Sequence, residues 1–383
     1  MWVYWAMFLL PASVALACRA PARTTEPSGA RLAGSNSAWV WVWLSITLLI
    51  GFRYAVGGDW GSYVLLLDDI RGQELVDVLL RKDPGYKLLN WVSVELGWGI
   101  YGVNLTCGAL FATGLVVFCR RQPMPWLALT VAVPYLMIVV AMGYSRQGVG
   151  VGLAMLGLVA LSKGSVRGFV AWVLLAATFH GTAVILLPIS ALAASQNRFW
   201  TAVWVTVVAA VAYSVLLAKD VESLYANYVD AGLQSEGALV RLLMNAAPAA
   251  VLLILRSRFR FDESEKRLWM LFAMISLALL GAFYVTSAST ALDRLALYMI
   301  PLQLAVFANV PYIFERSDKE QDVLNSDNYY LQQNFEISPI GSANAVFIIA
   351  IVLLYYGSIQ FVWLNFGANS MWWLPYRFYP LEF

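Results

Sequence analysis

The stretch IYGVNLTCGALFATGLVVFC, residues 100–119, contains no charged side chain and is followed at once by Arg120 and Arg121. A helix needs roughly 20 mostly apolar residues to cross the hydrocarbon core of a bilayer, and this run has that length. A second apolar run, residues 125–142, begins a few residues later. The pattern therefore predicts membrane helices joined by short connections.

The composition of the whole chain supports the same interpretation. Of its 383 residues, 61% are hydrophobic and 13% are charged, and the mean hydropathy is +0.69. Soluble globular domains do not have this composition. The net charge is only +2 and the basic residues are scattered, which excludes a nucleic-acid-binding surface. We expect an all-α polytopic membrane protein in which residues 1–383 form a single membrane domain.

Apolar runs bounded by charges or by Pro and Gly define twelve candidate spans. These runs cover residues 2–18, 39–56, 100–119, 125–142, 147–162, 168–180, 182–195, 199–218, 238–255, 268–288, 293–313 and 343–364. The two runs beside His180 are short, so a single bent helix there, with eleven spans in total, is an alternative. We prefer twelve spans, because eleven would place the basic segment RSRFR on the outside.

With both termini outside, 15 of the 25 basic residues fall in cytoplasmic loops, as the positive-inside rule requires. They are Arg19, Arg23, Arg31, Arg120, Arg121, Lys163, Arg167, Arg198, Arg256, Arg258, Arg260, Lys266, Arg267, Arg316 and Lys319. Residues 1–18 end in small side chains, as a signal peptide does, but they have no basic beginning. We therefore keep this segment as a span.

Three connections are long enough to have their own character. Residues 57–99 are expected to form a periplasmic amphipathic or re-entrant segment, in which Asp83 and Pro84 start a helix as N-cap and first residue. Residues 219–237 are expected to form a second periplasmic loop. Residues 315–342 are rich in Asn, Gln and Asp and are expected to form a flexible cytoplasmic loop.

The predicted topology gathers polar residues at the outer ends of the helices. They are Arg53, Asp59, Tyr63, Asp83, Tyr144, Arg146, Gln147, His180, Arg241, Asp293 and Arg294. An unpaired charge inside hydrocarbon costs about 2.5 to 3.5 kcal/mol, so such residues face a polar cavity or a partner. Guanidinium groups match phosphate oxygens, and Arg53, Arg146 and Arg294 are therefore candidates to bind a pyrophosphate.

Each candidate also has a structural interpretation, and these alternatives stay open at this point. An arginine can reach to lipid headgroups or pair with a carboxylate. Asp59 can be a helix N-cap or a general base, and His180 a packing residue or a proton carrier. Asp293 can cap the helix on which Arg294 and Tyr298 share a face. Asp68 and Asp69 are interpreted as a solvated acidic face rather than as a catalytic pair.

The sequence contains no set of ligands for a transition metal. Cys18, Cys107 and Cys119 form no CxxC pair, and His180 is the single histidine. We expect no metal site and no cofactor.

Five short blocks, taken together and in this order, resemble the EpsG family of Wzy-like exopolysaccharide polymerases. They are RYAVGGDWGSY (53–63), DPGYKLLN (83–90), GYSRQGVGVGL (143–153), FHGTAVILLP (179–188) and DRLALY (293–298). The family typically has Glu-Pro where this chain has Asp83–Pro84, so a carboxylate is kept on a shorter side chain.

The resemblance implies a fold like that of C-type membrane glycosyltransferases, in the bacterial inner membrane, with the active site facing the periplasm. It also implies polymerisation of oligosaccharide repeat units carried on undecaprenyl pyrophosphate, with a flippase and a chain-length regulator as further partners. Arg53, Arg146, Arg294 and Arg241 would then bind the pyrophosphate, and Asp59 or His180 would accept a proton. Binding of substrate would also involve Tyr63, Asp83, Tyr144, Gln147, Tyr298 and the aromatic tail MWWLPYRFY (371–379).

Two other functions remain as alternatives. A flippase or transporter of lipid-linked oligosaccharide needs a similar cationic cavity, but we find none of the internal repeats typical of transporters. A membrane polysaccharide O-acyltransferase would place a histidine for acyl loading from the cytoplasm, whereas His180 is predicted outside.

Overall fold

The computed structural model describes residues 1–17, 36–189, 198–216, 237–259, 261–286, 289–324 and 343–382. All named elements in these ranges are helices, accompanied by one isolated β-bridge between Arg53 and Phe378. The predicted loop 219–237 and the linker that follows the first helix lie almost wholly outside the described residues. Of the loop predicted at 315–342, residues 315–324 instead continue helix α16, and residues 325–342 lie outside the described residues.

The helices follow the predicted apolar runs, with bounds that shift by a few residues. In chain order they are α1 (Trp2–Ala17), α2 (Asn36–Gly51), α3 (Trp60–Asp68), α4 (Leu75–Leu79), α5 (Pro84–Glu95), α6 (Gly99–Cys119), α7 (Pro125–Ala132), the π-helix η1 (Val133–Ala141), α8 (Ser145–Ser162), α9 (Val166–Phe179), the 3-10 helix η2 (Gly181–Leu186), α11 (Arg198–Leu216), α13 (Ala238–Ile254), α14 (Glu263–Phe283), α15 (Ser289–Ala296), the 3-10 helix η5 (Leu297–Met299), α16 (Pro301–Leu324), α18 (Ala343–Phe366), the 3-10 helix η6 (Ser370–Trp372) and α19 (Tyr379–Glu382).

Four helices in the described ranges are long and apolar enough to cross a membrane, namely α6, α8, α14 and α18. A fifth span results if α15 with η5 and the first part of α16 count as one helix bent by 44°. Six further apolar helices have 10–17 residues. The chain thus has the architecture of a helical membrane protein, and the count of twelve spans stays a prediction.

Helices α6 and α8 form the centre of the bundle, and glycine allows them to touch. A methyl group built on Gly114 of α6 would lie only 1.9 Å from the carbonyl oxygen of Gly152 in α8. Small residues allow this close approach between membrane helices, where packing rather than the hydrophobic effect holds helices together. In contrast, α14 and α18 lie at the outside of the bundle, with 28% of their apolar windows buried.

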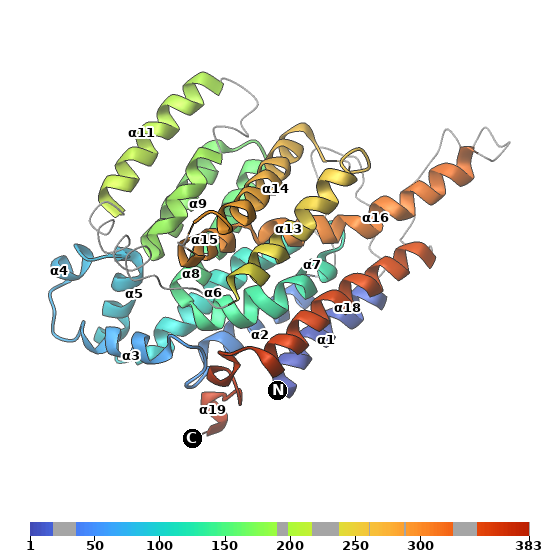
Figure 1. Ribbon diagram of the computed structural model, residues 1–383. Helices are drawn as coiled ribbons and strands as arrows, with labels where there is room; N and C mark the ends of the chain where they lie inside the picture. The colour runs from blue at the N-terminus through green and yellow to red at the C-terminus, as the bar shows by residue number, and fades with distance from the viewer. Residues whose placement is uncertain are drawn as a thin grey trace.

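The segment predicted to lie at the membrane interface is broken into three short helices. Figure 1 shows α3, α4 and α5 grouped at one end of the long helices, and the chain's C-terminus lies at that end too. Helix α5 begins at Pro84 with Asp83 in the N-cap position, as predicted. The apolar run expected at 182–195 begins as the 3-10 helix η2, and its last residues lie outside the described ranges.

A π-helix leads directly into the block GYSRQG. η1 contains Pro134 and ends at Ala141, and α8 then starts at Ser145. π-helical turns release backbone groups from regular pairing and are frequent at functional sites. Here the indole of Trp373 in the C-terminal tail donates to the carbonyl oxygen of Ile138 at 2.7 Å. The irregular turn thereby holds the start of α8 and the tail together.

Candidate functional site

An ion pair joins two of the sequence blocks at the end of the bundle that carries α3 and α5. The guanidinium of Arg146 donates to Asp83 Oδ2 at 2.8 Å, and the Asp83 side chain is only 2% exposed. The second oxygen of Asp83 accepts a bond from the backbone N–H of Gly181 at 3.2 Å. One carboxylate therefore ties the start of α8 to the turn between α9 and η2.

The backbone around Asp83 explains why this carboxylate reaches across the bundle. Asp83 has a φ of 55°, in the left-handed region that is unusual for a residue other than glycine. Its side chain makes no capping bond to its own helix. A methyl group on Gly85 would lie 2.4 Å from the hydroxyl of Thr178, so α5 packs directly on the end of α9.

Two tyrosines flank the guanidinium of Arg146. Its central carbon lies 5.9 Å from the ring centre of Tyr63 and 5.9 Å from that of Tyr86. The two rings are 5.7 Å apart, and both residues are buried. Burial raises the pKa of Tyr63 to about 12, with a further contribution from the nearby Asp59. Tyr63 thus stays neutral beside the arginine.

Arg294 is held by Gln147, one residue after Arg146. The Gln147 amide donates to the backbone carbonyl of Arg294 at 2.8 Å, and the Arg294 guanidinium donates back to Gln147 Oε1 at 3.3 Å. The guanidinium also lies 5.5 Å from the ring centre of Tyr144. The GYSRQG block therefore positions both arginines, Arg146 on its own helix and Arg294 from α15.

Asp59 lies in the field of both arginines. It occupies the N-cap position of α3, as one of the two interpretations expects, but its side chain makes no capping hydrogen bond. Burial raises the pKa of its carboxyl above the usual range, although Arg294 and Arg146 act in the opposite direction. A partly buried carboxylate of raised pKa is a stronger proton acceptor than an ordinary aspartate.

Buried polar groups without partners lie next to this cluster. Neither ring nitrogen of His180 has a hydrogen-bond partner among the described residues, and the hydroxyls of Thr182 and Tyr298 have none beyond a weak contact with each other. A methyl group on Gly150 would lie 3.0 Å from the Tyr298 hydroxyl and 3.6 Å from His180 Cβ. Buried polar groups are normally satisfied, so such a group of unsatisfied atoms indicates a place for water or for a polar ligand.

Most of the chain matches a known protein family. A family model described as the EpsG family matches residues 37–324. The chain belongs to the EpsG family. No curated protein and no solved structure matches it. Membership in this family indicates a polymerase-like role in polysaccharide biosynthesis, and all five sequence blocks that carried the resemblance lie within the matched region.

Arg53 of this EpsG-family protein is placed differently from the other predicted arginines. Its side chain is wholly buried and donates to the carbonyl oxygens of Ile50 and Val56, to Asn104 Oδ1 and to Ser145 Oγ. These bonds tie the end of α2 to α6 and to the start of α8. Arg53 has no exposed surface for a pyrophosphate, and its geometry is that of a positioning residue.

Arg241 and Asp293 form a two-pronged ion pair between α13 and α15. Arg241 Nε donates to Asp293 Oδ1, and its NH2 donates to Oδ2 at 2.7 Å. Asp293 lies inside α15, which begins at Ser289, so its interpretation as a helix cap is wrong. The pair anchors the helix that carries Arg294. Tyr298, which follows Arg294 by four residues, is buried in η5.

Two further features concern the acidic pair Asp68 and Asp69 and the possible ligands of a metal ion. Asp68 pairs with Arg71 and Asp69 with Arg81, all on exposed side chains or nearly so, as expected for a solvated face. No group of three His, Cys, Asp or Glu within the described ranges could hold a metal ion.

The C-terminal tail, which lies beyond the family match, does not present its aromatic residues as one sugar-binding surface. Trp373 is 2% exposed, and a methyl group on Gly143 would lie 2.4 Å from its ring. The backbone N–H of Gly57 donates to the carbonyl of Trp372 at 2.9 Å, and that of Tyr54 donates to Arg377 at 3.0 Å. The tail thus supports the loop that carries Asp59.

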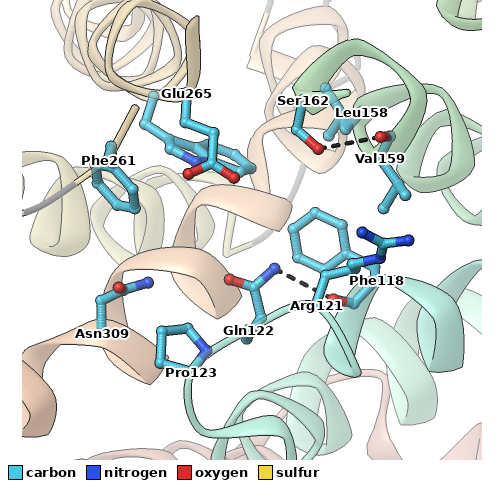
Figure 2. Close-up of a pocket in the computed structure, with 11 residues that line it drawn as sticks. Phe118, Arg121, Gln122, Pro123, Leu158, Val159, Ser162, Phe261, Glu265 and Asn309 are labelled. Atoms are coloured by element: carbon cyan, nitrogen blue, oxygen red, sulfur yellow. Dashed lines mark hydrogen bonds between the residues drawn. The ribbon is translucent and has the colours of Figure 1, made fainter. Parts of the chain in front are cut away.

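Sequence reasoning missed several members of this site. Tyr86 lies in the quoted block DPGYKLLN and Ser145 in GYSRQG, so the blocks themselves contained the signal. Thr182 and Gly150 likewise lie in the quoted blocks FHGTAVILLP and GYSRQGVGVGL. Figure 2 shows a pocket that is separate from this site. Its residues Phe118 and Ser162 lie at the C-terminal ends of α6 and α8, whereas Arg146 lies at the start of α8.

Proposed function

We propose that this EpsG-family protein polymerises oligosaccharide repeat units that are carried on undecaprenyl pyrophosphate. One observation carries the proposal: Gln147, next to Arg146 in the chain, is hydrogen-bonded to Arg294, so both arginines are held at one end of the bundle, near Asp59. Two fixed guanidinium groups suit a diphosphate, and the nearby carboxylate suits a proton transfer. The family relationship supports the same class of reaction.

The reaction needs one bond to form and one to break. A hydroxyl oxygen of the acceptor repeat unit attacks the anomeric carbon of the donor chain, and the bond from that carbon to the pyrophosphate oxygen breaks. The electron pair leaves with undecaprenyl pyrophosphate, and the hydroxyl proton passes to Asp59. Arg146 and Arg294 stabilise the negative charge that develops on the leaving group, an electrostatic contribution that preorganised cations provide.

The remaining polar residues bind and orient the sugars in this proposal. Neither ring nitrogen of His180 has a hydrogen-bond partner among the described residues, so the ring can exchange hydrogen bonds with sugar hydroxyl groups. Thr182 and Tyr298 contribute further hydroxyls to the same place. Tyr63, Tyr144 and Gln147 hold the two arginines, and Asp83, Arg53 and Arg241 fix the surrounding backbone.

The proposed reaction takes place at a membrane surface. The protein would lie in the bacterial inner membrane with about twelve spans and a C-type glycosyltransferase architecture, its site facing the periplasm. The positive-inside distribution supports this orientation. Donor and acceptor would both be lipid-linked, and a flippase and a chain-length regulator would act before and beside the polymerase.

Reconstitution of the purified full-length chain tests the proposal. Liposomes that contain the protein and lipid-linked repeat units should yield glycans longer than one repeat, with release of undecaprenyl pyrophosphate. Liposomes with the Arg146→Ala variant are the control for the requirement of the site. Movement of the lipid-linked units across the bilayer without lengthening would contradict polymerisation and favour a flippase.

A further inference from the structure

Three buried polar side chains from three helices form one chain of hydrogen bonds inside the bundle. Asn245 lies on α13, Gln303 on α16 and Tyr356 on α18. The Tyr356 hydroxyl donates to Gln303 Oε1 at 2.8 Å, and Gln303 Nε2 donates to Asn245 Oδ1 at 2.7 Å. The Asn245 amide then donates to the backbone carbonyl of Ala296 at 2.8 Å. This hydrogen-bond chain thus ends two residues after Arg294.

The direction of the bonds follows from the acceptor at the end of the hydrogen-bond chain. A backbone carbonyl only accepts, so Asn245 turns its NH2 group to Ala296 and its oxygen to Gln303. Gln303 must then turn its own NH2 group to Asn245 and its oxygen to Tyr356, whose hydroxyl donates. The nitrogen and oxygen of both amides are therefore bonded. A substitution anywhere in the hydrogen-bond chain leaves a buried polar group unpaired, which is costly.

Ala296 lies where the candidate span formed by α15 and α16 is broken. The segments Ser289–Met299 and Pro301–Phe314 meet at an angle of 44°. In a regular α-helix the N–H of Ile300 would bond to Ala296, but here it bonds to Leu297 at 3.4 Å. A backbone carbonyl that loses its regular partner inside a membrane protein needs another donor. The amide at the end of the hydrogen-bond chain is that donor.

The turn that carries Arg294 is held from two directions. Gln147 of α8 donates to the carbonyl of Arg294 at 2.8 Å, and Asn245 of α13 donates to the carbonyl of Ala296. Two neighbouring helices thus hold two carbonyl groups of the same turn. The position of the Arg294 guanidinium depends on both contacts, because its side chain projects from this backbone.

The far end of the hydrogen-bond chain is fixed by aromatic packing. The ring of Tyr356 meets that of Phe307 edge to face, with 5.6 Å between their centres. Phe307 follows Gln303 by four residues, so the two side chains share one face of α16. Tyr356 lies beyond the region 37–324 that matches the family model. A residue outside the matched region therefore completes the hydrogen-bond chain that reaches the turn of Arg294.

We propose that this hydrogen-bond chain places Arg294 for the transition state by setting the bend between α15 and α16. Asn245, Gln303 and Tyr356 are positioning residues, which act through the backbone and do not touch the substrate. The inference rests on the proposed function, in which Arg294 stabilises the charge that develops on the leaving pyrophosphate.

A cycle of variants in the reconstituted full-length protein tests the link to Arg294. Asn245→Leu keeps a branched side chain and removes the bond to Ala296. It should lower kcat for chain growth by about 10- to 100-fold and change the KM for the donor by less than about threefold, because a shift of about 1 Å at a catalytic group mainly slows the reaction. In an Arg294→Ala background the same change should lower kcat no further, since two changes that act through one group are not additive. An equal loss of kcat in both backgrounds would overturn the proposal.

A milder pair of variants tests the far end of the hydrogen-bond chain. Tyr356→Phe keeps the packed ring and removes only the hydroxyl that donates to Gln303. It should lower kcat in the same direction as Asn245→Leu and leave the KM for the donor unchanged. Tyr355→Phe is the matched control, because Tyr355 is the preceding residue of α18 and is 36% exposed. Equal kcat values for the two tyrosine variants would overturn the proposal.

Hydrogen exchange separates this inference from the proposed function, because it needs no turnover. In the full-length protein in detergent, amides of residues 289–300 should exchange faster in Asn245→Leu than in the wild type, and amides of α6 should not. Wild-type exchange of 289–300, or faster exchange throughout the protein, would overturn the proposal. Faster exchange confined to 289–300, in a protein whose wild type makes no polymer, would support the role of the hydrogen-bond chain in setting the bend and reject the proposed reaction.

Discussion

Arg146 and Asp83 meet at 2.8 Å although 63 residues separate them in the chain. The Asp83 side chain is 2% exposed, whereas Arg146 keeps 32% of its side chain accessible. The pair is therefore asymmetric: the carboxylate is enclosed, and the guanidinium is held by it while one side stays open. Such an arrangement fixes the cation in place and leaves the guanidinium N–H groups that Asp83 does not use open to a ligand.

The first prediction concerns the cost of breaking this pair. Arg146→Ala leaves a buried carboxylate without its cation, and removal of one partner of a buried pair typically costs about 3 kcal/mol. The double variant Arg146→Ala, Asp83→Asn should regain most of that stability and should still make no polymer. Thermal unfolding in detergent and the liposome assay measure the two effects separately. A double variant as unstable as the single one would show that charge burial is not the cause.

The sequence predicted the helical membrane architecture and supplied the residues of the candidate site, but it did not predict the contacts between those residues. Runs of apolar residues locate spans because the requirement is one of length and charge, which the chain shows directly. The five blocks likewise contain Arg146, Asp59, Arg294 and His180, which the structure brings to one end of the bundle. The blocks could not show which arginine is enclosed by contacts with other helices and which stays accessible to a ligand. Arg53 carries the same charge as Arg146, yet its neutral partners, Asn104 and Ser145, come from two other helices.

The same limit applies to the expected helix caps. Asp59 occupies an N-cap position but makes no capping bond, and Asp293 lies inside α15 rather than at its start. Asp293 pairs with Arg241, 52 residues away in the chain, and Asp59 lies near two arginines from distant segments. A local pattern indicates only whether a side chain can bond to its own backbone. Partners from distant segments offer the same side chain other bonds, which the pattern does not show.

The second prediction tests Arg294 as the other half of the proposed clamp. Arg294→Ala should lower the turnover of chain growth by about 10² to 10³, the loss typical of one preorganised charge-stabilising donor. Arg294→Lys should keep part of the activity, because it retains the charge but loses the planar fork. Arg377→Ala, an exposed arginine at the same end of the bundle, is the control. Full turnover in Arg294→Ala would remove this residue from the mechanism.

The third prediction is a pH dependence set by Asp59. Because burial raises the pKa of this carboxyl, it becomes protonated at a higher pH than an ordinary aspartate. A proton acceptor must be ionised, so the turnover of the wild type should fall as the pH falls through that raised pKa. Asp59→Asn should lower turnover by about 10² to 10⁴ and lose this acid limb while still binding the lipid-linked donor.

A comparison variant for this experiment is Asp68→Asn. Asp68 is exposed, pairs with Arg71 and lies on the same short helix, so its loss should change neither the rate nor the acid limb. An Asp59→Asn enzyme that keeps the wild-type acid limb would assign the proton acceptor to another residue.

The fourth prediction separates two neighbouring tryptophans in the C-terminal tail. Trp373 is 2% exposed and donates to Ile138, whereas Trp372 is 52% exposed. Trp373→Ala should destabilise the protein by about 3 to 5 kcal/mol, as removal of a large buried side chain does, and should reduce chain growth by loosening the loop before α3. Trp372→Ala should change stability by less than about 0.5 kcal/mol. Equal effects of the two changes would contradict the supporting role of the tail.

The fifth prediction tests the space beside His180. Gly150→Ala adds a methyl group 3.0 Å from the Tyr298 hydroxyl, in the place where we expect acceptor hydroxyls to bind. One methyl group in a fitted site changes specificity by roughly 10- to 200-fold, so the KM for the acceptor should rise by about tenfold while the donor still binds. Gly281→Ala is the matched change, because a methyl group there meets nothing within 4 Å and alanine favours the helix. A Gly150→Ala enzyme that elongates chains with the wild-type KM would contradict this placement of the acceptor. The buried polar atoms of His180, Thr182 and Tyr298 would then hold water. The acceptor would instead bind on the exposed side of Arg146.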